Sequence, residues 1–413
     1  MRALIVAVGS RGDVAPFTGL ATAMNAAGHP TAIAAYQMFA GLVTGCGLEF
    51  RALPGDPRML DAARWQRGGT GPLGAARLVR LIAAHMRDLH AGMLAAARQR
   101  IDVLLLAGLS YAGGYHIAEG LGLPSMALQL SPVAPTRDFP PSIVTARSLG
   151  RCGNLAAGHA LVILGAPVLA GPVRELRAGL GLRRLSARQA VYGRMNRPDW
   201  PVLHGFSPAV VPRPADWRPG AEVVGYWWPA RPQGWRPRPE LEAFLNAGPA
   251  PVFVGFGSMT PADANREAAV AAAAARQARV RLVLQAGGAG LDLAGPAGDS
   301  VVVGDVPHDW LFPRMAAVVH HAGAGTTAAG LRAGVPAVTV PMIGDQPFWA
   351  ARIAALGAGP PPIRFRRLSV PVLAAAIRDA VSRPSYRARA QQLAARLADD
   401  DAAAAVVATL DDL

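Results

Sequence analysis

The sequence predicts an α/β protein of two Rossmann-like domains, each a doubly wound parallel sheet, that face a central cleft. Three observations support this fold class. Residues 3–8, a loop, a helical segment and residues 31–35 form a βαβ unit at the start of the chain. Residues 251–256 and the loop after them repeat the first strand and loop of that unit in the second half. A proline-rich stretch separates the two halves, as an interdomain linker would.

The first βαβ unit opens on the unbroken apolar run ALIVAV at residues 3–8, which is typical of a buried parallel strand. The loop GSRGDV follows, and we expect a helix at residues 17–27 with Pro16 near its start. The loop lacks the third glycine of the dinucleotide-binding fingerprint, and Tyr36 and Gln37 stand where that fingerprint needs an acidic residue. An NAD-dependent enzyme is therefore disfavoured.

In the rest of the first half, apolar runs alternate with helical segments. Residues 155–173 form the most membrane-like window of the chain. We interpret them as a buried or partly exposed helix, because glycines, prolines and His159 interrupt the apolar run. The other expected elements are a polar connection at 49–70, helices at 73–98 and 110–121, strands at 102–106 and 125–128, and a loop at 129–141.

Proline and tryptophan mark the boundary between the two halves. Residues 208–219 and 231–239 are rich in proline, and the motif GYWWP lies between them. Such a composition is typical of an interdomain linker. It places a first domain at residues 1–215, the linker at 216–240, a second domain at 241–395 and a terminal helix at 396–413.

Composition excludes several enzyme classes. All 41 basic residues are arginine. Without lysine no Schiff base can form, so PLP enzymes and lysine-dependent aldolases are excluded. A P-loop kinase is disfavoured as well, because the Walker A motif needs a lysine. The two cysteines, Cys46 and Cys152, are too few for a zinc site or a disulfide framework and fit a reducing cytoplasm.

The formal net charge of +14 favours an anionic partner. However, the arginines are scattered and aromatic residues make up only 6% of the chain, so nucleic acid is disfavoured. An anionic small molecule or a membrane surface accounts better for the charge. Histidines such as His85, His90 and His116 lack metal-ligand spacing, and no acidic cluster is visible, so we expect no metal site.

The most informative stretch lies at residues 315–358. An apolar strand is followed by His320 and His321 and by the loop AGAGTT, which leads into a helix. A second apolar strand runs into a polar loop that carries Asp345 and Gln346 and opens another helix. These are two consecutive βα units of a parallel sheet. Both loops fall at the carboxyl ends of the strands, where such sheets bind ligands.

The glycine-rich loop suits an anion such as a phosphate. Gly323 and Gly325 allow the backbone to approach a ligand closely, and Thr326 offers a hydroxyl group. The N–H groups at the helix start favour negative charge, as does the helix dipole. His321 adds a hydrogen-bond donor at the end of the strand.

The second polar loop suits a polyol. Asp345 and Gln346 offer acceptors and donors side by side, as vicinal hydroxyl groups require. A phosphate site next to a polyol site indicates a sugar nucleotide. On chemistry alone the alternative stays open, namely a glycine-rich turn with two buried histidines and a helix-capping aspartate.

At these residues the chain resembles the donor-binding signature of nucleotide-sugar glycosyltransferases with two Rossmann domains, the GT-B fold. The segments HHAGAGTT, LRAGVP and GDQPFWAAR carry the resemblance, together with GSRGDV near the amino terminus. It covers essentially the whole chain. It is closest in style to the bacterial branch of sterol glucosyltransferases and glycopeptide- and macrolide-antibiotic glycosyltransferases. It implies an acceptor-binding first domain, a donor-binding second domain and a terminal helix that packs back on the first domain.

The resemblance also implies roles for individual residues. Asp13 is the proposed general base that takes the proton of the acceptor hydroxyl. From the sequence alone, Asp13 could equally be a helix N-terminal acid stabilised by the dipole. One or more of Val306, His308 and Trp310 would hold the nucleotide base. The full set of expected donor-contacting residues is Ser10, Gly12, Ser258, Val306, His308, Trp310, His321, Gly323, Gly325, Thr326, Asp345 and Gln346.

Two positions depart from the pattern of plant members of the family. Ala329 stands where those members carry an acidic residue that grips the ribose, and Asp305 lies near the place of their base-stacking tryptophan. The bacterial branch tolerates both changes. The departures leave the choice between uridine and thymidine nucleotides open.

We therefore predict an inverting, metal-independent hexosyltransferase of secondary metabolism that needs no cofactor. It would move a hexose from UDP-glucose or a dTDP-sugar to a hydroxyl of a hydrophobic natural product, polyketide or sterol-like acceptor. Two alternatives stay open: a nucleotide-sugar epimerase of the same fold and a non-catalytic relative that binds a partner protein. We expect a cytoplasmic protein, and peripheral membrane association remains an option.

Overall fold

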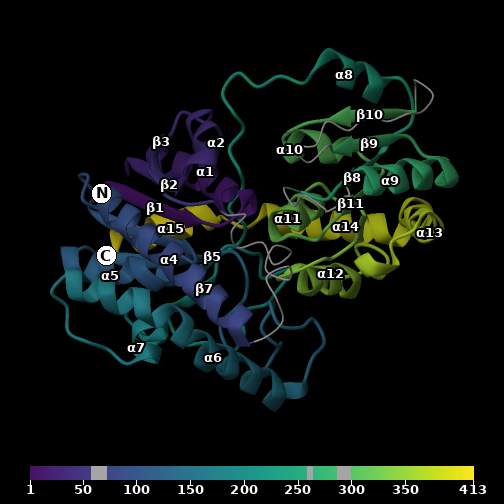
Figure 1. The fold of residues 1–413 in the computed structure, drawn as a ribbon. Coiled ribbons are helices and arrows are strands. Elements are labelled where there is room, and N and C mark those ends of the chain that lie inside the picture. Colours follow the sequence, from purple (N-terminus) through teal and green to yellow (C-terminus); the bar gives the residue numbers. More distant parts are fainter. Residues whose placement is uncertain (57–71, 258–263, 286–298) are drawn as a thin grey trace.

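The computed structural model describes residues 1–56, 72–257, 264–285 and 299–413. Within these ranges the strands form two parallel sheets, which are the cores of two α/β domains lying side by side (Figure 1). This arrangement confirms the predicted fold class of two doubly wound parallel-sheet domains. The second half of the chain thus repeats the architecture of the first.

Among the described residues, the first domain forms a seven-stranded sheet in the order β3-β2-β1-β4-β5-β6-β7, and every neighbouring pair is parallel. The apolar run of β1 is buried at every position because both faces of the sheet are covered. The strands are β1 (Ala3–Val8), β2 (Thr31–Tyr36), β3 (Glu49–Leu53), β4 (Val103–Gly108), β5 (Ser125–Gln129), β6 (Val202–His204) and β7 (Ala221–Val223).

Helices of the first domain connect these parallel strands. The longest of them, α6, lies against α4, α5 and α7 rather than against a strand. The helices are α1 (Arg11–Ala26), α2 (Ala40–Thr44), α4 (Pro72–Ala97), α5 (Tyr111–Leu121), α6 (Gly150–Gly179) and α7 (Ala187–Tyr192), with short 3-10 turns η1 (Gln37–Phe39) and η3 (Arg194–Asn196).

The second domain forms a five-stranded parallel sheet in the part that the structure describes, in the order β10-β9-β8-β11-β12. Its strands are β8 (Val252–Gly255), β9 (Leu282–Gln285), β10 (Ser300–Val303), β11 (Ala317–His320) and β12 (Ala337–Thr339). Its helices are α8 (Pro239–Asn246), α9 (Ala264–Ala278), α10 (His308–Leu311), α11 (Ala324–Arg332), α12 (Gln346–Ala355), α13 (Val370–Ser382) and α14 (Pro384–Ala398), with 3-10 turns η4 (Phe312–Arg314) and η5 (Phe365–Arg367).

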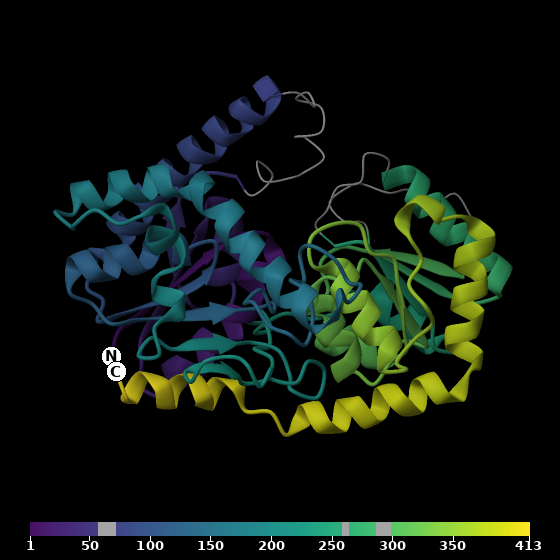
Figure 2. The same cartoon turned by 90° about the horizontal axis from the view of Figure 1, so that it is seen from below.

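The last helix, α15 (Ala402–Asp411), lies on the first domain. The chain leaves α14, which packs against α11, and continues to α15, which contacts α1 (Figure 2). The indole N–H of Trp227 donates to the carbonyl of Ala402 at 3.1 Å, and the ring of His29 lies 3.4 Å from the carboxylate of Asp411. The end of the chain therefore ties the two domains together a second time.

Three sequence-based boundaries need correction. The first helix begins at Arg11 rather than at residue 17, because Ser10 and Asp13 close its first turn with side-chain hydrogen bonds. Pro16 consequently lies inside the helix. The polar connection expected at 49–70 begins with strand β3, whose charged side chains stand at an exposed sheet edge. The linker expected at 216–240 includes the edge strand β7, which belongs to the first sheet.

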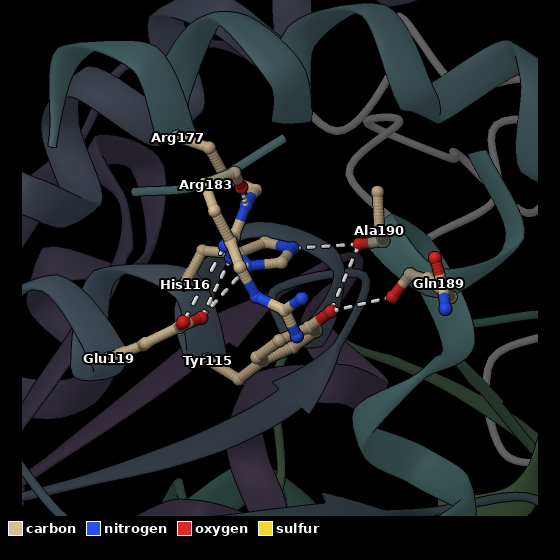
Figure 3. Close-up of polar contacts among 7 residues, drawn as sticks. All are labelled: Tyr115, His116, Glu119, Arg177, Arg183, Gln189 and Ala190. Carbon is tan, nitrogen blue, oxygen red and sulfur yellow. Dashed lines mark hydrogen bonds and ion pairs between the residues drawn. The ribbon is translucent and has the colours of Figure 1, made fainter. Parts of the chain in front are cut away.

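A buried polar network holds α5, α6 and α7 together (Figure 3). The guanidinium of Arg177 donates to Nδ1 of His116 at 2.6 Å, to the carboxylate of Glu119 at 2.7 Å and to the carbonyl of Arg183 at 2.9 Å. Nε2 of His116 pairs with the carbonyl of Ala190 at 2.7 Å. Because Arg177 is a donor only, Nδ1 of His116 must accept and Nε2 must carry the proton. The network therefore fixes the tautomer of His116.

Candidate functional site

Two of the loops predicted to form the site follow strands at the switch points of the two sheets. In the first sheet, β2 and β3 lie on one side of β1, and the strands that follow in the sequence, from β4 onward, lie on its other side. In the second sheet, the strand order reverses in the same way between β8 and β11. Open parallel sheets bind ligands outside the carboxyl ends of strands at such points. GSRGDV follows β1, and AGAGTT follows β11. The helices that begin there, α1 and α11, contact each other across the domain boundary.

Asp13 lies in the first turn of α1. Its Oδ2 accepts hydrogen bonds from the backbone N–H and the hydroxyl of Ser10, at 2.7 and 2.9 Å. The pKa of Asp13 is raised above its usual range, chiefly because the surrounding protein desolvates the carboxylate; the Ser10 hydrogen bonds oppose the rise, and the charge of Asp345 adds to it. Asp13 therefore does cap the helix, and this helix contacts α11 of the second domain.

Gly9 leaves the space that the Asp13 carboxylate occupies. A Cβ atom on Gly9 would lie 2.3 Å from Oδ2 of Asp13. Any side chain at position 9 would therefore displace the carboxylate. Ser10 and Gly12, on the same turn, are exposed, so this turn presents polar groups to solvent beside Asp13.

His321 follows β11, and glycines enclose its ring. A Cβ atom on Gly257 would lie 2.6 Å from Cε1 of His321, and one on Gly323 would lie 2.5 Å from Nε2. Both neighbours must therefore be glycine for the ring to keep this place. Burial lowers the pKa of His321 to about 4, so the ring is neutral at pH 7. Its Nδ1 is buried and has no hydrogen-bond partner among the described residues.

His320 shapes the turn between β11 and α11. Its Nδ1 accepts a hydrogen bond from the N–H of Ala322 at 3.0 Å. Ala322 adopts a φ of 63°, a left-handed conformation that residues other than glycine seldom take. Such strain concentrates at ligand-binding turns. The helix α11 then begins with Gly323 as its N-cap, and its first N–H groups have no acceptor within the helix.

Three further positions in this turn differ in exposure. Gly325 is exposed and Thr326 is half-buried. Thr327 is buried, and its Oγ1 has no hydrogen-bond partner in the part of the chain that the structure describes. Buried polar atoms without partners are uncommon in folded proteins and call for an explanation. The turn thus combines free backbone donors with an unpaired hydroxyl.

His308 lies near His321 at the start of α10. Its ring stacks on Phe312 with centroids 4.2 Å apart. The pKa of His308 is lowered to about 4, first by burial and then by the nearby positive charge of Arg11 and by His321, while Asp309 opposes the shift. His308 is therefore neutral at pH 7, and Arg11 of the first domain reaches it across the boundary.

Trp310 points to the linker. Its ring lies 5.4 Å from that of Trp235, and the guanidinium of Arg314 lies 4.4 Å over it. Val306 is half-buried and packs against the core. Of the three residues expected around a nucleotide base, Trp310 thus has its ring occupied by neighbours, whereas His308 lies with the other site residues.

Asp345 is the N-cap of α12 and Gln346 is the first residue of that helix, and the two use their oxygens differently. Oδ2 of Asp345 accepts hydrogen bonds from the hydroxyl of Ser131, in the first domain, and from the indole N–H of Trp349 at 2.8 Å. Oε1 of Gln346 accepts two backbone N–H groups of its own loop, at 2.8 and 3.1 Å. Asp345 therefore faces the domain boundary, and the oxygen of Gln346 holds the loop in shape.

Two residues at the boundary were missed in the sequence. Nη2 of Arg11 lies 2.7 Å from Oδ2 of Asp305, so this ion pair joins the domains, and Ser131 joins them through Asp345. Arg11 belongs to the motif GSRGDV, but the roles expected in that motif fell on its neighbours Ser10, Gly12 and Asp13. Ser131 falls in the loop expected at 129–141, but nothing local marks a serine as a partner of a residue more than two hundred positions away.

The structure therefore places Asp13 within electrostatic influence of Asp345, and His308 within that of His321, in loops of the two domains that meet at the boundary. The described residues contain no group of three or more histidine, cysteine, aspartate or glutamate side chains that could hold a metal ion. Hollows of about 450 Å³ beside α7 and 480 Å³ at the amino ends of β1 and β2 lie elsewhere. One predicted donor residue, Ser258, lies outside the described residues.

Two family models match the chain, one in each domain. The glycosyltransferase family 28 N-terminal domain matches residues 3–140. The erythromycin biosynthesis protein CIII-like C-terminal domain matches residues 269–413. The fold, the glycine-rich turn and both matches define the class of protein as a nucleotide-sugar glycosyltransferase of the GT-B type.

Relatives along the full chain agree with this class. The chain is 37% identical to O-mycaminosyltylonolide 6-deoxyallosyltransferase of Streptomyces fradiae over 95% of its own length and 93% of that enzyme. It is 32% identical to sterol 3-beta-glucosyltransferase UGT80A2 of Arabidopsis thaliana over 98% of its length, but spans only 64% of that longer enzyme. The chain belongs to the glycosyltransferase family that contains these enzymes.

Solved structures confirm the fold. The glycosyltransferase SsfS6 of Streptomyces sp. SF2575, complexed with thymidine diphosphate, superposes with a TM-score of 0.65 and covers all of both chains at 23% identity. Spinosyn forosaminyltransferase SpnP gives a TM-score of 0.71 at 16% identity, over all of this chain and 98% of that one. At these identities the likeness supports the GT-B fold and not a shared substrate.

Proposed function

We propose that this chain is an inverting hexosyltransferase that moves a hexose from a UDP- or dTDP-sugar to a hydroxyl of a hydrophobic acceptor, with Asp13 as general base. One observation carries the proposal. Asp13 lies in the first turn of α1 in the first domain, and α1 contacts α11 of the second domain, which begins at the turn around His321. A base and a donor site on opposite domains are what transfer between two bound substrates requires.

The proposed step balances without a metal ion. The acceptor oxygen attacks the anomeric carbon from the face opposite the diphosphate, and its proton passes to Oδ1 or Oδ2 of Asp13. The bond between the anomeric carbon and the β-phosphate oxygen breaks, and its electron pair leaves with the diphosphate. The raised pKa of Asp13 supports the role, because a carboxylate with a higher pKa is a stronger base.

The turn between β11 and α11 would stabilise the leaving diphosphate. Its first helical N–H groups are free of intrahelical acceptors, and the helix dipole adds partial positive charge there. A neutral His321 would donate one ring N–H to phosphate, and the hydroxyl of Thr327 would donate another hydrogen bond. Donors placed in advance of the reaction stabilise the charge that develops as the bond breaks.

The sugar hydroxyls would be bound by Asp345, with Gln346 keeping the loop in place. Asp345 also accepts from Ser131, so the sugar would lie where the two domains meet. We favour a UDP-sugar because the segment GDQPFWAAR resembles that of sterol glucosyltransferases. A dTDP-sugar is the second donor to test, because SsfS6 binds thymidine diphosphate. For the acceptor we propose a sterol-like or macrolide-like aglycone, the two classes named in the relatives.

Turnover tests the proposal directly. UDP-glucose and dTDP-glucose are incubated with a sterol and a macrolide aglycone, and products are identified by mass spectrometry and their anomeric configuration by NMR. We expect transfer with inversion. Asp13→Asn should lower kcat about 10²- to 10⁴-fold while nucleotide binding is kept. An epimerase would convert the donor without an acceptor. A non-catalytic relative would show no turnover with either donor.

We also propose a cytoplasmic protein that touches a membrane surface through α6. Among the described residues, α6 is the one helix long and apolar enough to cross a membrane by length and composition, and 28% of its apolar window is buried. Its contacts with α4, α5 and α7 favour a helix lying on a bilayer over one crossing it. Exposed residues on and before this helix include the large apolar side chains and arginines Ile143, Val144, Arg147, Leu149, Arg151, Ile163 and Leu164.

Vesicle binding tests the membrane contact. Sedimentation with vesicles of anionic lipid should carry the protein down, and zwitterionic vesicles should do so less, because the flanking arginines need negative charge. The double variant Ile163→Glu and Leu164→Glu should reduce binding, since both side chains are exposed in solution. Equal sedimentation of the wild type and this variant would contradict the proposed surface.

A further inference from the structure

We propose that Arg11 is the cation that binds the β-phosphate of the nucleotide sugar, and that Asp305 holds its guanidinium group while the donor is absent. This inference rests on the proposed function, since it requires a nucleoside diphosphate between the two domains. Arg11 is two residues from Asp13, and Asp305 lies in the loop that follows β10. Their ion pair, with Nη2 and Oδ2 2.7 Å apart, spans the domain boundary.

The histidines of the site carry no positive charge at pH 7 in this structure. Burial lowers the pKa of His308 and His321 to about 4 and that of His320 to about 3, so all three are neutral at pH 7. The nearby Asp13 and Asp345 carry carboxyl groups and add no positive charge. A diphosphate gains negative charge as the sugar leaves, and the helix dipole of α11 offers only a partial charge against it. A full positive charge is therefore missing unless an arginine supplies it.

Three other arginines around the boundary have partners that are not carboxylates. The guanidinium of Arg332 lies 4.4 Å over the ring of Trp228, that of Arg352 donates to the carbonyl of Val210, and that of Arg314 lies over Trp310. Arg11 differs from all three, because its partner is a carboxylate on the opposite domain. A carboxylate presents two oxygens to a guanidinium much as a phosphate does.

The ion pair of Arg11 is also easily exchanged. The side chain of Arg11 is 41% exposed and that of Asp305 is 62% exposed. Exposed ion pairs contribute little to stability, because water competes for both partners. A phosphate bound at the turn around His321 could therefore take over the guanidinium, while Asp305 returns to solvent.

The position of Arg11 in the chain, close to Asp13, indicates that it would bind the β-phosphate and not the α-phosphate. Asp13 is proposed to lie beside the anomeric carbon, and that carbon is bonded to the β-phosphate oxygen. Arg11 projects from the same helical turn as Asp13 and lies close enough to His308 to lower its pKa. The α-phosphate would remain with the N–H groups of α11. Arg11 would thus hold the end of the diphosphate that departs from the sugar.

Binding of nucleotides of different length tests the assignment. The affinities of UDP, UMP, dTDP and dTMP are measured by titration calorimetry at fixed ionic strength for the wild type, Arg11→Gln and Asp305→Asn. Arg11→Gln should weaken diphosphate binding about tenfold or more and leave monophosphate binding unchanged. Asp305→Asn should strengthen diphosphate binding several-fold, because it releases Arg11. The two variants should therefore act in opposite directions.

Arg231→Gln is the matched control. Arg231 forms an ion pair of the same length with Asp309, and its side chain is 46% exposed against 41% for Arg11; the pair joins the linker to α10. It should not change the ratio of diphosphate to monophosphate affinity. Thermal unfolding checks that each variant is folded.

Three outcomes decide the matter. Opposite effects of Arg11→Gln and Asp305→Asn support the assignment. Equal losses in both variants, or an unchanged ratio in Arg11→Gln, would mean that the ion pair only straps the domains together. If the wild type binds neither UDP nor dTDP at millimolar concentration, the donor site itself is wrong, and the inference falls with it.

Discussion

Two histidines, one in each domain, share a low pKa and differ in how their ring atoms are paired. Burial is the chief reason why the pKa of both His116 and His321 falls to about 4. Around His116 both ring nitrogens are hydrogen-bonded, to Arg177 and to the carbonyl of Ala190. Around His321, Nδ1 is buried without a partner among the described residues. Burial makes both rings neutral, but only His116 has both of its ring nitrogens paired by the protein itself.

The difference separates a structural site from a binding site. A buried polar atom without a partner costs about 1–3 kcal/mol. The network at Arg177 avoids that cost and fastens three helices to one another (Figure 3). The turn around His321 bears the cost at several atoms, including Oγ1 of Thr327 and Nε2 of His320. A ligand that supplies the missing partners would explain why such atoms are kept there.

Removal of Arg177 should give the largest effect on stability. Arg177→Leu leaves Nδ1 of His116 and the carbonyl of Arg183 without a donor. We expect the free energy of unfolding in urea to fall by about 3–4 kcal/mol, while the folded protein still binds nucleotide. Arg174→Leu, an exposed position on the same helix, should cost less than about 0.5 kcal/mol. Equal losses of unfolding free energy in the two variants would contradict the structural role proposed for the network.

Stability should fall in acid because of these histidines. In the unfolded chain a histidine takes up a proton near pH 6.5, whereas His116 and His321 stay neutral in the folded state until about pH 4. Stability is therefore complete above pH 6.5 and declines as pH falls to about 4, by up to about 3 kcal/mol for each histidine.

Two variants separate that pH effect from the hydrogen bonds. His116→Asn and His321→Asn should each flatten the slope of unfolding free energy against pH by up to about 1.4 kcal/mol per pH unit. His116→Asn should also lose stability at every pH, because its pairs with Ala190 and Arg177 disappear. If His321→Asn lost a similar amount of unfolding free energy at neutral pH, the proposed difference between the paired His116 and the unpaired His321 would be wrong.

The sequence predicted the two domains and the glycine-rich turn because local patterns determine them. Apolar runs of strand length and glycines beside His321 are visible without knowledge of the fold. The two glycines at which a Cβ atom would strike the ring, Gly257 and Gly323, follow different strands, β8 and β11, so only the structure explains the need for both.

Side-chain pairs between distant parts of the chain were not predictable. Arg177 joins His116 over 61 positions, and Ser131 joins Asp345 over 214 positions. No periodicity records such pairs, since each residue alone looks like an ordinary polar side chain. The start of α1 was misplaced for a related reason. The hydrogen bonds between Ser10 and Asp13 override the expectation that Pro16 marks the first turn.

Loss of His321 should affect binding more than folding. His321→Ala removes one donor to the phosphate, and we expect UDP or dTDP to bind about tenfold more weakly. His159→Ala, at an exposed position on α6, is the control and should leave nucleotide affinity unchanged. Titration calorimetry measures both. Unchanged affinity in His321→Ala would show that the unpaired Nδ1 does not mark a ligand site.

Two threonines give the smallest and sharpest test. Oγ1 of Thr327, in α11, and Oγ1 of Thr339, in β12, are both buried without partners in the described part of the chain. Replacing either by valine removes an unsatisfied hydroxyl, so both variants should gain about 0.5–1 kcal/mol in unfolding free energy. Only Thr327→Val should also weaken nucleotide binding, by a few-fold, because α11 begins at the proposed phosphate site. If both variants keep full affinity, Thr327 is an ordinary buried threonine and the unpaired atoms around His321 do not act as one ligand-binding set.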